Sequence, residues 1–229
     1  MQYGGDGTIN CILNCIINTK NYLGVIPIGT GNDFYRSLNQ KEGLYNKVDV
    51  GKVNEKYFIN TACFGIDADV ANNSKIIKNK LIPISQRYNA SVIYTFLKYK
   101  NKEIEFSCDS YNKSGKFTTI AICNGRYYGG GYKIAPTSKY DDGLFDVYYA
   151  YNLRKIALPS LILKMKKGKH EGTKYIQKIQ TNEVTIKSKN KIICNIDGEE
   201  IEDKIFHIKL KDKAIVIYNN KELIDKILD

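Results

Sequence analysis

Apolar residues recur at helical spacing close to the start of the chain. After Thr8, the apolar positions that fall on one side of a helix are Ile9, Ile12, Leu13, Ile16 and Ile17. The mainly apolar run Leu23–Ile28 predicts a short buried strand, and a second helix is predicted to begin at Phe34. This order of helix, strand and helix, with a glycine turn before each helix, is typical of an α/β domain.

Beyond about Val48 the pattern changes to short β-rich stretches separated by turn residues. These stretches are Tyr57–Ile59, Phe106–Ser107, Phe117–Cys123, Phe145–Ala150, Val184–Ile186, Lys191–Ile196, Ile205–Leu210 and Ala214–Tyr218. Their spacing predicts an antiparallel β-sandwich. Two stretches have a helical pattern instead: Ala68–Lys100, with one or two helices, and Leu153–Lys167, where Pro159 breaks or restarts the helix.

The predicted fold is α/β plus all-β, a truncated Rossmann-like nucleotide-binding domain followed by an antiparallel β-sandwich. The α/β domain is assigned to residues 1–50, the sandwich with its inserted helices to residues 51–220, and a C-terminal helix that packs back on the first domain to residues 221–229. An α/β sheet needs several parallel strands, yet only Met1–Tyr3 precedes the first glycine turn. We therefore expect that a strand–helix–strand segment is missing, and that the exposed sheet edge lowers solubility or pairs two copies as a homodimer.

Composition indicates a globular protein. Of the 229 residues, 43% are hydrophobic and 26% are charged. Disordered chains have fewer hydrophobic residues and a higher net charge, so this composition excludes an intrinsically disordered protein. Apolar runs stop well short of the ~20 residues that span a bilayer, and the N-terminus resembles no secretory signal, so we expect a cytoplasmic protein. The net charge of +11 favours binding to an anionic partner: nucleic acid, an anionic membrane surface or a phosphate-bearing substrate. Much of this charge comes from lysines spread along the whole sequence.

The six cysteines indicate no metal site. They lie in apolar stretches without the Cys-x-x-Cys or Cys/His pairs that zinc requires, so we interpret them as reduced core residues. Only Cys11 and Cys15 share one face of a predicted helix, and no second pair follows them.

Two glycine-rich turns carry the candidate chemistry. Gly4-Gly5-Asp6-Gly7-Thr8 precedes the first helix, where glycine lets backbone N–H groups approach a phosphate and the helix dipole adds positive charge. Gly29-Thr30-Gly31-Asn32-Asp33 repeats this chemistry after the next strand, and such turns line one ligand crevice in an open α/β sheet. A helix cap provided by Asp6 is the plain structural alternative.

These turns, read as GGDGT and PIGTGNDF, resemble the catalytic domain of diacylglycerol kinases and related bacterial lipid kinases, in the sphingosine kinase superfamily. Further segments resemble later landmarks of that family and occur in the same order: Asn60–Val70, Asn124–Pro136, Asp141–Asp146, Gly168–His170 and Asp197–Glu199. The resemblance therefore covers nearly the whole chain.

The resemblance implies an ATP-dependent, Mg²⁺-requiring lipid kinase. The implied ATP-binding residues are Gly4, Gly5, Asp6, Gly7, Thr8, Ile9, Asn10 and Thr30. Asp6 and Asp33 would organise Mg²⁺ and the phosphates, and Glu199 would be the general base. A structural Mg²⁺ site would use Asp142 with the carbonyls of Lys139 and Leu144. The acceptor would be diacylglycerol or a similar lipid alcohol.

The chemistry of phosphoryl transfer also supports Glu199 as the general base. Phosphorylating a hydroxyl requires a carboxylate within hydrogen-bonding reach of the attacking O–H, and the Asp197-Gly198-Glu199 turn could project one into a cleft. An ordinary acidic hairpin turn is the alternative. Gly129-Gly130-Gly131 is interpreted as a place of close packing or a bend and is not assigned to phosphate.

Two other functions compete with a lipid kinase. NAD kinases share the GGDGT loop, and a catalytically inactive lipid-binding module would fit the missing segment and the positive charge. The basic stretch Lys164–Lys169 could rest on anionic lipid, which would make the protein peripheral to the membrane, or could be a solvated face. Nucleic-acid binding is disfavoured because neither a recognition-helix pattern nor a basic-aromatic RNA motif is present.

Overall fold

The computed structural model describes residues 2–29, 31–38, 44–66, 68–69, 95, 98–109 and 111–228. Most of the stretch Ala68–Lys100, which was predicted to be helical, lies outside these residues, and so does the candidate ATP ligand Thr30. The description below refers to the described residues.

The chain opens with a βαβ unit. Strand β1 (Gln2–Gly4) leads into helix α1 (Asp6–Ile16), and β2 (Tyr22–Pro27) returns parallel to β1 before α2 (Asp33–Leu38) begins. The predicted first helix, the strand and the second helix are confirmed. Their apolar sides meet in one buried cluster, because helices pack on a sheet through their apolar stripes.

The rest of the chain is mostly β-structure. The strands are β3 (Tyr45–Val53), β4 (Lys56–Phe58), β5 (Thr61–Gly65), β6 (Lys102–Cys108), β7 (Tyr111–Cys123), β8 (Phe145–Tyr151), β9 (Gln177–Thr181), β10 (Glu183–Ile196) and β11 (Glu199–Tyr218). A short 3₁₀ helix η1 (Lys155–Ala157) precedes α5 (Leu158–Lys166), and α6 (Lys221–Leu228) ends the chain.

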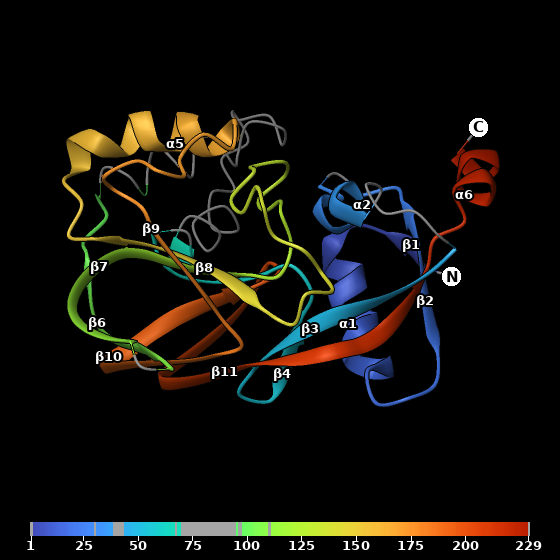
Figure 1. The fold of residues 1–229 in the computed structure, drawn as a ribbon, viewed down its shortest axis with the longest axis horizontal. Coiled ribbons are helices and arrows are strands. Elements are labelled where there is room, and N and C mark those ends of the chain that lie inside the picture. The colour runs from blue at the N-terminus through green and yellow to red at the C-terminus, as the bar shows by residue number, and fades with distance from the viewer. Residues whose placement is uncertain are drawn as a thin grey trace, which may run out of the picture.

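Eleven described strands form one connected, strongly curled sheet. Its main order is β1-β2-β11-β10-β5-β7-β8-β9, with β3 and β4 added beside β11. Strands β5 and β6 both lie between β10 and β7, so the sheet curls into a β-sandwich-like domain, seen at the left of Figure 1. Pairing in this domain is antiparallel, as predicted.

The C-terminal β-structure differs from the prediction, which gave no strand at β9 and divided each of β10 and β11 into two strands. The separate strands predicted at Ile205–Leu210 and Ala214–Tyr218 are parts of one 20-residue strand, β11, and Val184–Ile186 and Lys191–Ile196 likewise belong to β10. In each case polar residues that resemble a turn form a register shift within the strand. At the shift in β11, Lys213 has φ 44°, as expected of a β-bulge rather than a chain reversal.

Strand β11 joins the two parts of the molecule. Its first half pairs with β10 in the sandwich-like domain, whereas Val216–Tyr218 pair in parallel with Tyr22–Gly24 of β2 and in antiparallel fashion with β3. The α/β part therefore receives strands from far along the chain. The sequence pattern did not predict this parallel pairing.

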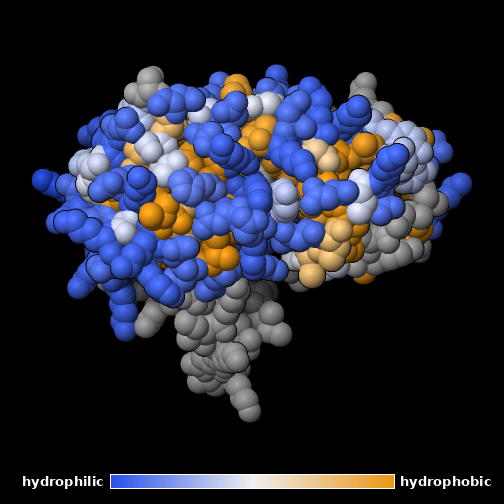
Figure 2. All heavy atoms as spheres, turned by 90° about the horizontal axis from the view of Figure 1, so that it is seen from below, coloured by the Kyte–Doolittle hydropathy of each residue, from blue (hydrophilic) through white to orange (hydrophobic). Residues whose placement is uncertain are grey.

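Three buried apolar clusters correspond to the layers. One fills the interior of the curled sheet, a second lies between β7, β8 and α5, and the third lies under α1 and α2. Seen from below, the molecule is mostly hydrophilic, and apolar side chains show between the charged ones (Figure 2).

The helices after the sheet agree with the sequence pattern. Pro159 lies in the first turn of α5, where its missing N–H costs no hydrogen bond, so the helix restarts there after η1. Helix α6 buries Ile224, and its Asp225 acts electrostatically on Tyr35 of α2. None of the described helices is both long and apolar enough to cross a bilayer.

We expect Ile217→Ala to destabilise the whole protein. Ile217 is fully buried in the part of β11 that pairs with β2 and β3, and removing such a side chain costs about 2–5 kcal/mol. Urea unfolding followed by circular dichroism should show one transition at lower urea. The control Ile205→Ala changes a 45% exposed side chain of the same strand and should change stability little. Loss of only part of the signal would contradict a shared strand.

Candidate active site

The two glycine turns touch each other. A Cβ on Gly29 would lie 2.3 Å from the Cα of Gly5 and 2.6 Å from its nitrogen, so only glycine permits this approach. The side chain of Asn32 holds the second turn: its Oδ1 accepts the N–H of Gly29 at 3.1 Å, and its Nδ2 donates to the carbonyl of Pro27 at 3.0 Å. The predicted pair of turns therefore forms one structure.

Asp6 joins the N-termini of α1 and α2. It is the first residue of α1, yet its two carboxylate oxygens accept the N–H groups of Asp33 and Phe34, each at 2.9 Å. Asp6 therefore caps the other helix rather than its own. The first turn of α1 contains the exposed residues Gly7 and Thr8. Backbone N–H groups in the first turn of a helix, together with the helix dipole, suit an anion.

Asp33 is a buried carboxylate with two partners. Arg36 donates from Nη1 at 2.7 Å, and the backbone N–H of Gly130 donates at 2.8 Å. Burial raises the pKa of Asp33 to about 6; nearby Asp6 adds to this, while Gly130 and Arg36 oppose it. A carboxylate with a raised pKa in such a place is a candidate functional group.

The three glycines beside Asp33 come from the second half of the chain. Gly129, Gly130 and Gly131 have φ values of 63°, 82° and 109°, which strongly favour glycine, and a Cβ on Gly131 would lie 3.2 Å from Nη1 of Arg36. The positive φ values fit the bend that was one of the two interpretations from the sequence, whereas a Cβ on Gly130 would meet nothing within 4 Å, so close packing does not account for that glycine. The hydrogen bond to Asp33 could not be foreseen, because it joins distant segments.

The Asp197-Gly198 turn places a second buried carboxylate. Both residues have positive φ, 47° and 95°, as in the two-residue turns that suit twisted hairpins. Asp197 accepts the N–H groups of Ile59 at 2.6 Å and Thr61 at 2.8 Å, and the Nδ2 of Asn10 at 3.2 Å. Burial raises the pKa of Asp197 to about 6, although these donors oppose the shift.

Glu199 follows this turn as the first residue of β11. Its side chain is 44% exposed, and its Oε2 lies 3.1 Å from Nζ of Lys56 on β4. Asp197 is held inside the protein while Glu199 reaches solvent. The two acids of one turn therefore have different environments.

Tyr140 lies at the centre of the carboxylates. Its buried hydroxyl donates to Oδ1 of Asn60 at 2.5 Å. Burial raises the pKa of Tyr140 well above its usual range, and the charges of Asp197, Asp6 and Asp33 raise it further. One neutral phenol therefore lies within electrostatic range of acids from both glycine turns and from the Asp197 turn.

The turn with the proposed structural metal ligands lies near two further acids. The N–H of Leu144 donates to Oδ1 of Asp142 at 3.2 Å, and the N–H of Gly143 donates to Oδ2 of buried Asp49 at 2.9 Å. Burial raises the pKa of Asp49, and Asp212, on the bulge of β11, raises it further. Carboxylate and carbonyl oxygens are the donors that Mg²⁺ prefers, so the donor set fits this ion.

Side chains alone do not complete that metal site. Nowhere among the described residues do three His, Cys, Asp or Glu side chains gather closely enough to hold an ion. The backbone carbonyls of Lys139 and Leu144 would therefore be needed as well.

Known protein families match both parts of the chain. Residues 60–218 match the YegS C-terminal NAD kinase beta sandwich-like domain, and residues 1–56 match the diacylglycerol kinase catalytic domain. The chain belongs to the diacylglycerol kinase family of lipid kinases. Enzymes of this family are transferases.

Individual proteins agree with this membership. A diacylglycerol kinase of Bacillus subtilis is 28% identical over 214 residues, which cover 86% of this chain and 69% of that protein. A Chromohalobacter salexigens protein named as a probable lipid kinase, YegS-like, is 25% identical and covers 93% of this chain and 73% of its own. The crystal structure of a diacylglycerol kinase from Bacillus anthracis str. Sterne shares the fold, with a TM-score of 0.67, 19% identity and coverage of 96% and 75%.

The structure separates the candidate ATP ligands of this lipid kinase into two groups. Gly5, Asp6, Gly7 and Thr8 lie at the start of α1 beside the second turn. The side chain of Ile9 is in the apolar core, and that of Asn10 binds Asp197. Neither side chain faces an open surface.

Three residues that assemble the site were not predicted from the sequence. Tyr140 and Asn60 form the central hydrogen bond, and the Nδ2 of Asn124 donates to the carbonyls of Asp49 and Ile59, each at 2.8 Å. Asn60 and Asn124 both begin segments that resemble family landmarks, which was the available signal. Their partners could not be read from the sequence because they lie far along the chain.

The buried state of Asp33 predicts a pH effect on stability. The folded protein holds a proton that the unfolded chain has released, so the contribution of Asp33 to stability is full below pH 3.8 and is lost as the pH rises to about 6. The free energy of unfolding of the wild type should therefore fall, relative to Asp33→Asn, by on the order of 1–3 kcal/mol across this range.

Urea unfolding at a series of pH values measures this difference. Asp203→Asn, which removes an exposed carboxylate from β11, is the matched control. Parallel curves for the wild type and Asp33→Asn would contradict the assignment.

Proposed function

We propose that this chain is an ATP-dependent lipid kinase that transfers the γ-phosphoryl group of ATP to the hydroxyl of diacylglycerol or a similar lipid alcohol. The observation that carries the proposal is the contact between the two glycine turns, which brings Asp6 and Asp33 together at the start of α1. Family membership and the names of the relatives support the substrate class.

In this proposal the start of α1 binds the phosphates of ATP. Backbone N–H groups from Gly5 to Gly7 donate to phosphate oxygens, because the first turn of a helix has donors without partners inside the helix, whereas the N–H of Thr8 already donates to the carbonyl of Gly5 at 3.1 Å. The segment Gly4–Asn10 supplies this loop through its backbone, with Ile9 and Asn10 anchoring it from inside. Thr30, which lies outside the described residues, completes the assignment.

Asp6 and Asp33 provide negative charge beside these donors. We assign Mg²⁺ to this pair, where it would neutralise phosphate charge and align the γ-phosphate for transfer. Arg36 and Gly130 hold the Asp33 carboxylate in place, and the N–H groups of Asp33 and Phe34 hold Asp6. Both carboxylates are thus fixed before any ligand binds, which lowers the cost of positioning the reactants.

Glu199 accepts the proton of the lipid hydroxyl. Its Oε2 is paired with Lys56, and the proposal assigns Oε1 to the substrate. Asp197 fixes the preceding turn through buried hydrogen bonds, so it acts as a positioning residue. Removing the proton as the oxygen attacks phosphorus makes the hydroxyl a better nucleophile.

Glu199→Gln should lower kcat about 100- to 10,000-fold while ATP binding is kept, because the amide cannot accept the proton but has nearly the same shape. Transfer of radiolabelled phosphate from ATP to diacylglycerol in mixed micelles measures the reaction. Glu202→Gln, an exposed acid three residues along β11, is the control and should keep wild-type activity. A Glu199→Gln enzyme with full activity would refute this role.

NAD kinase is the competing enzymatic function, because the matched family model is described as NAD kinase beta sandwich-like. Incubation with ATP and NAD in place of lipid separates the two, and formation of NADP would overturn the lipid assignment. Vesicle binding without any affinity for ATP would indicate an inactive lipid-binding module instead.

We also assign a structural Mg²⁺ to Asp142 with the carbonyls of Lys139 and Leu144. A ligand bound only by the folded state stabilises it by about 2.7 kcal/mol at 100 times its Kd. Mg²⁺ should therefore raise the melting temperature of the wild type, and Asp142→Asn should lose much of this gain. Asp141→Asn, also exposed and directly adjacent, is the control. Equal gains in all three proteins would contradict the assignment.

A further inference from the structure

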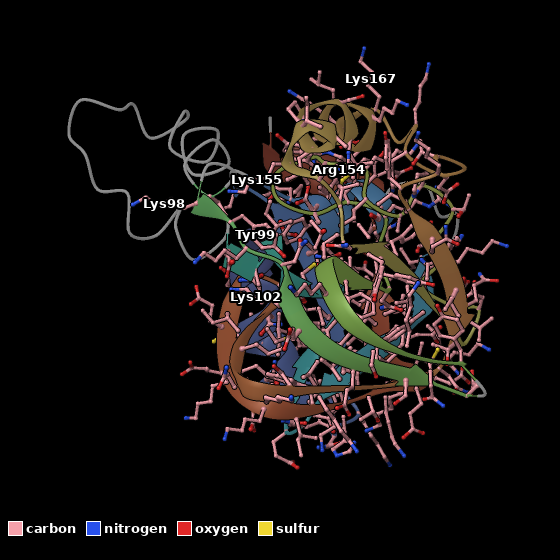
Figure 3. All side chains as sticks on the ribbon, turned by 90° about the vertical axis from the view of Figure 1, so that its left-hand side faces the viewer. Lys98, Tyr99, Lys102, Arg154, Lys155 and Lys167 are labelled. Carbon is pink, nitrogen blue, oxygen red and sulfur yellow. The ribbon has the colours of Figure 1, made fainter. Side chains whose placement is uncertain are left out.

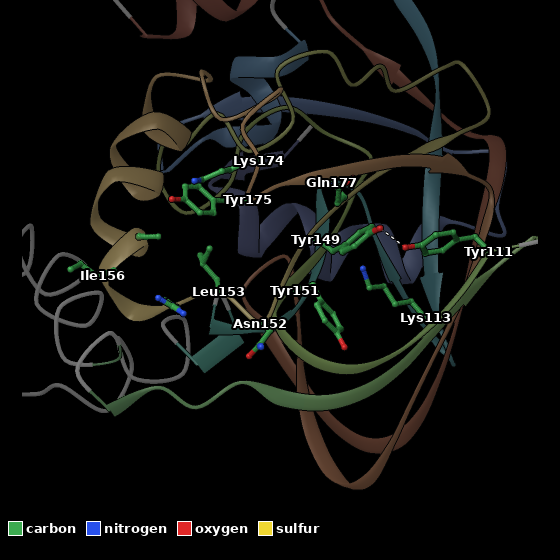
Figure 4. A pocket seen from close by; sticks show the side chains of 12 residues that line it. Tyr111, Lys113, Tyr149, Tyr151, Asn152, Leu153, Ile156, Lys174, Tyr175 and Gln177 are labelled. Carbon is green, nitrogen blue, oxygen red and sulfur yellow. Dashed lines mark hydrogen bonds between the residues drawn. The ribbon is translucent and has the colours of Figure 1, made fainter.

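A cavity lies at the end of the sandwich-like domain, away from the glycine turns. It has a volume of about 760 Å³ and lies between the ends of β7 and β8, the η1–α5 segment and the chain leading into β9 (Figure 4). Its charged lining residues are all cations: Lys113, Arg154 and Lys174. Tyr149 and Tyr151 form much of the remaining wall, so the cavity combines positive charge with aromatic surface.

Tyrosine rings hold two of these cations in position. The Nζ of Lys113 lies 4.3 Å from the ring centre of Tyr151 and 5.5 Å from that of Tyr149, and the Nζ of Lys174 lies 5.2 Å from that of Tyr175. Such cation–π contacts orient an ammonium group without neutralising its charge. No ion pair between described residues uses Lys113, Arg154 or Lys174. The cavity therefore attracts anions.

The helix beside the cavity exposes large apolar side chains. Ile156 in η1 is 87% exposed and Leu163 in α5 is 64% exposed. Pro159 and Leu163 are four residues apart and so share one face of α5, opposite the buried Leu158 and Leu161, and the helix ends at its C-cap Lys167. Exposed apolar side chains with a basic rim are typical of a membrane or protein contact.

The charged residues of the segment that carries these side chains are all cations. Between Asn152 and Lys169 the sequence has six cations and no acid: Arg154, Lys155, Lys164, Lys166, Lys167 and Lys169. Figure 3 shows Lys155 close to Lys98 and Lys102, Arg154 just above them and Lys167 at the top of the view; Lys102 is paired with Asp69 at 3.1 Å. A basic helix with an exposed apolar face complements a surface of anionic phospholipids.

The position of this helix also suits a lipid kinase. In Figure 1 helix α5 lies at the top of the left part of the molecule, and α2, whose first residue is Asp33, lies further right and lower, in the upper half of the other part. A planar surface resting on α5 would therefore lie on the side to which the glycine turns belong.

We propose that the η1–α5 face docks on an anionic phospholipid bilayer, with Ile156 and Leu163 among the acyl chains and one phospholipid phosphate in the cavity of Lys113, Arg154 and Lys174. The lipid nature of the partner rests on the proposed function. The docking geometry rests on the exposed side chains, the charge and the cavity. A nucleic acid would also meet cations and tyrosines here, but it offers no apolar medium to Ile156 and Leu163.

Vesicle co-sedimentation without ATP tests the proposal. The full chain should bind vesicles of phosphatidylcholine mixed with phosphatidylglycerol and should bind phosphatidylcholine alone much more weakly. Ile156→Asp with Leu163→Asp should weaken binding to the mixed vesicles at least about tenfold, because two side chains lose their apolar burial. Ile205→Asp, an exposed apolar position on β11, is the control and should bind normally. Unchanged binding of the Ile156/Leu163 variant would refute insertion.

A second pair of variants tests the cavity. Arg154→Gln with Lys174→Gln should reduce binding to anionic vesicles more than Lys191→Gln with Lys204→Gln, which removes the same charge from exposed positions of β10 and β11. Equal losses would show general attraction only and overturn the head-group site. Competition with single-stranded RNA gives a second test. The head-group site would also be overturned if the RNA displaced the vesicles and its binding needed Arg154 and Lys174 but not Ile156 and Leu163.

The proposed docking face and the proposed function can be refuted independently of each other. Glu199→Gln should still bind vesicles, and the Ile156/Leu163 variant should still phosphorylate a short-chain, water-soluble diacylglycerol. A wild-type protein that binds anionic vesicles but phosphorylates no lipid would refute the proposed function and leave the docking face intact. A protein that phosphorylates the soluble lipid but binds no vesicle would refute the docking face alone.

Discussion

The buried carboxylate of Asp197 is the interaction on which the arrangement of the site depends. It accepts backbone N–H groups from Ile59 and Thr61 and the side-chain amide of Asn10 on α1. The Asp197 carboxylate thereby holds together α1, the link between β4 and β5, and the turn that precedes Glu199. A buried charge is costly unless hydrogen bonds satisfy it, so these segments hold their positions together.

A second constraint is the close approach of the two glycine turns. The contact of Gly5 with Gly29 leaves no space for a side chain, and Asp6 closes the same junction by capping α2. Asp6 and Asp33 are therefore brought together by backbone packing and need no ligand to assemble. The two carboxylates differ in setting, because Asp33 is buried and Asp6 is only partly so.

The sequence was informative where the signals were local. Glycine turns before helical spacing predicted α1 and α2 and placed both turns at one crevice, and short β-rich stretches predicted most strands. It was not informative about β11, because the pairing of Val216 with Tyr22 depends on residues from opposite ends of the chain. The bulge at Lys213 has the polar composition of a turn, so one strand was predicted as two. Tyr140 was missed for the same reason: its role comes from acids on three separate segments.

The course of β11 also has a consequence for the order of folding. The glycine turns are synthesised long before Val216–Tyr218, the part of β11 that pairs with β2. Contacts between distant segments are slow to form, and β2 cannot pair with β11 until β11 has been synthesised. The residues assigned to ATP therefore acquire their final geometry late, which gives a nascent chain a long period in which β2 has an unpaired edge and needs protection from other strands.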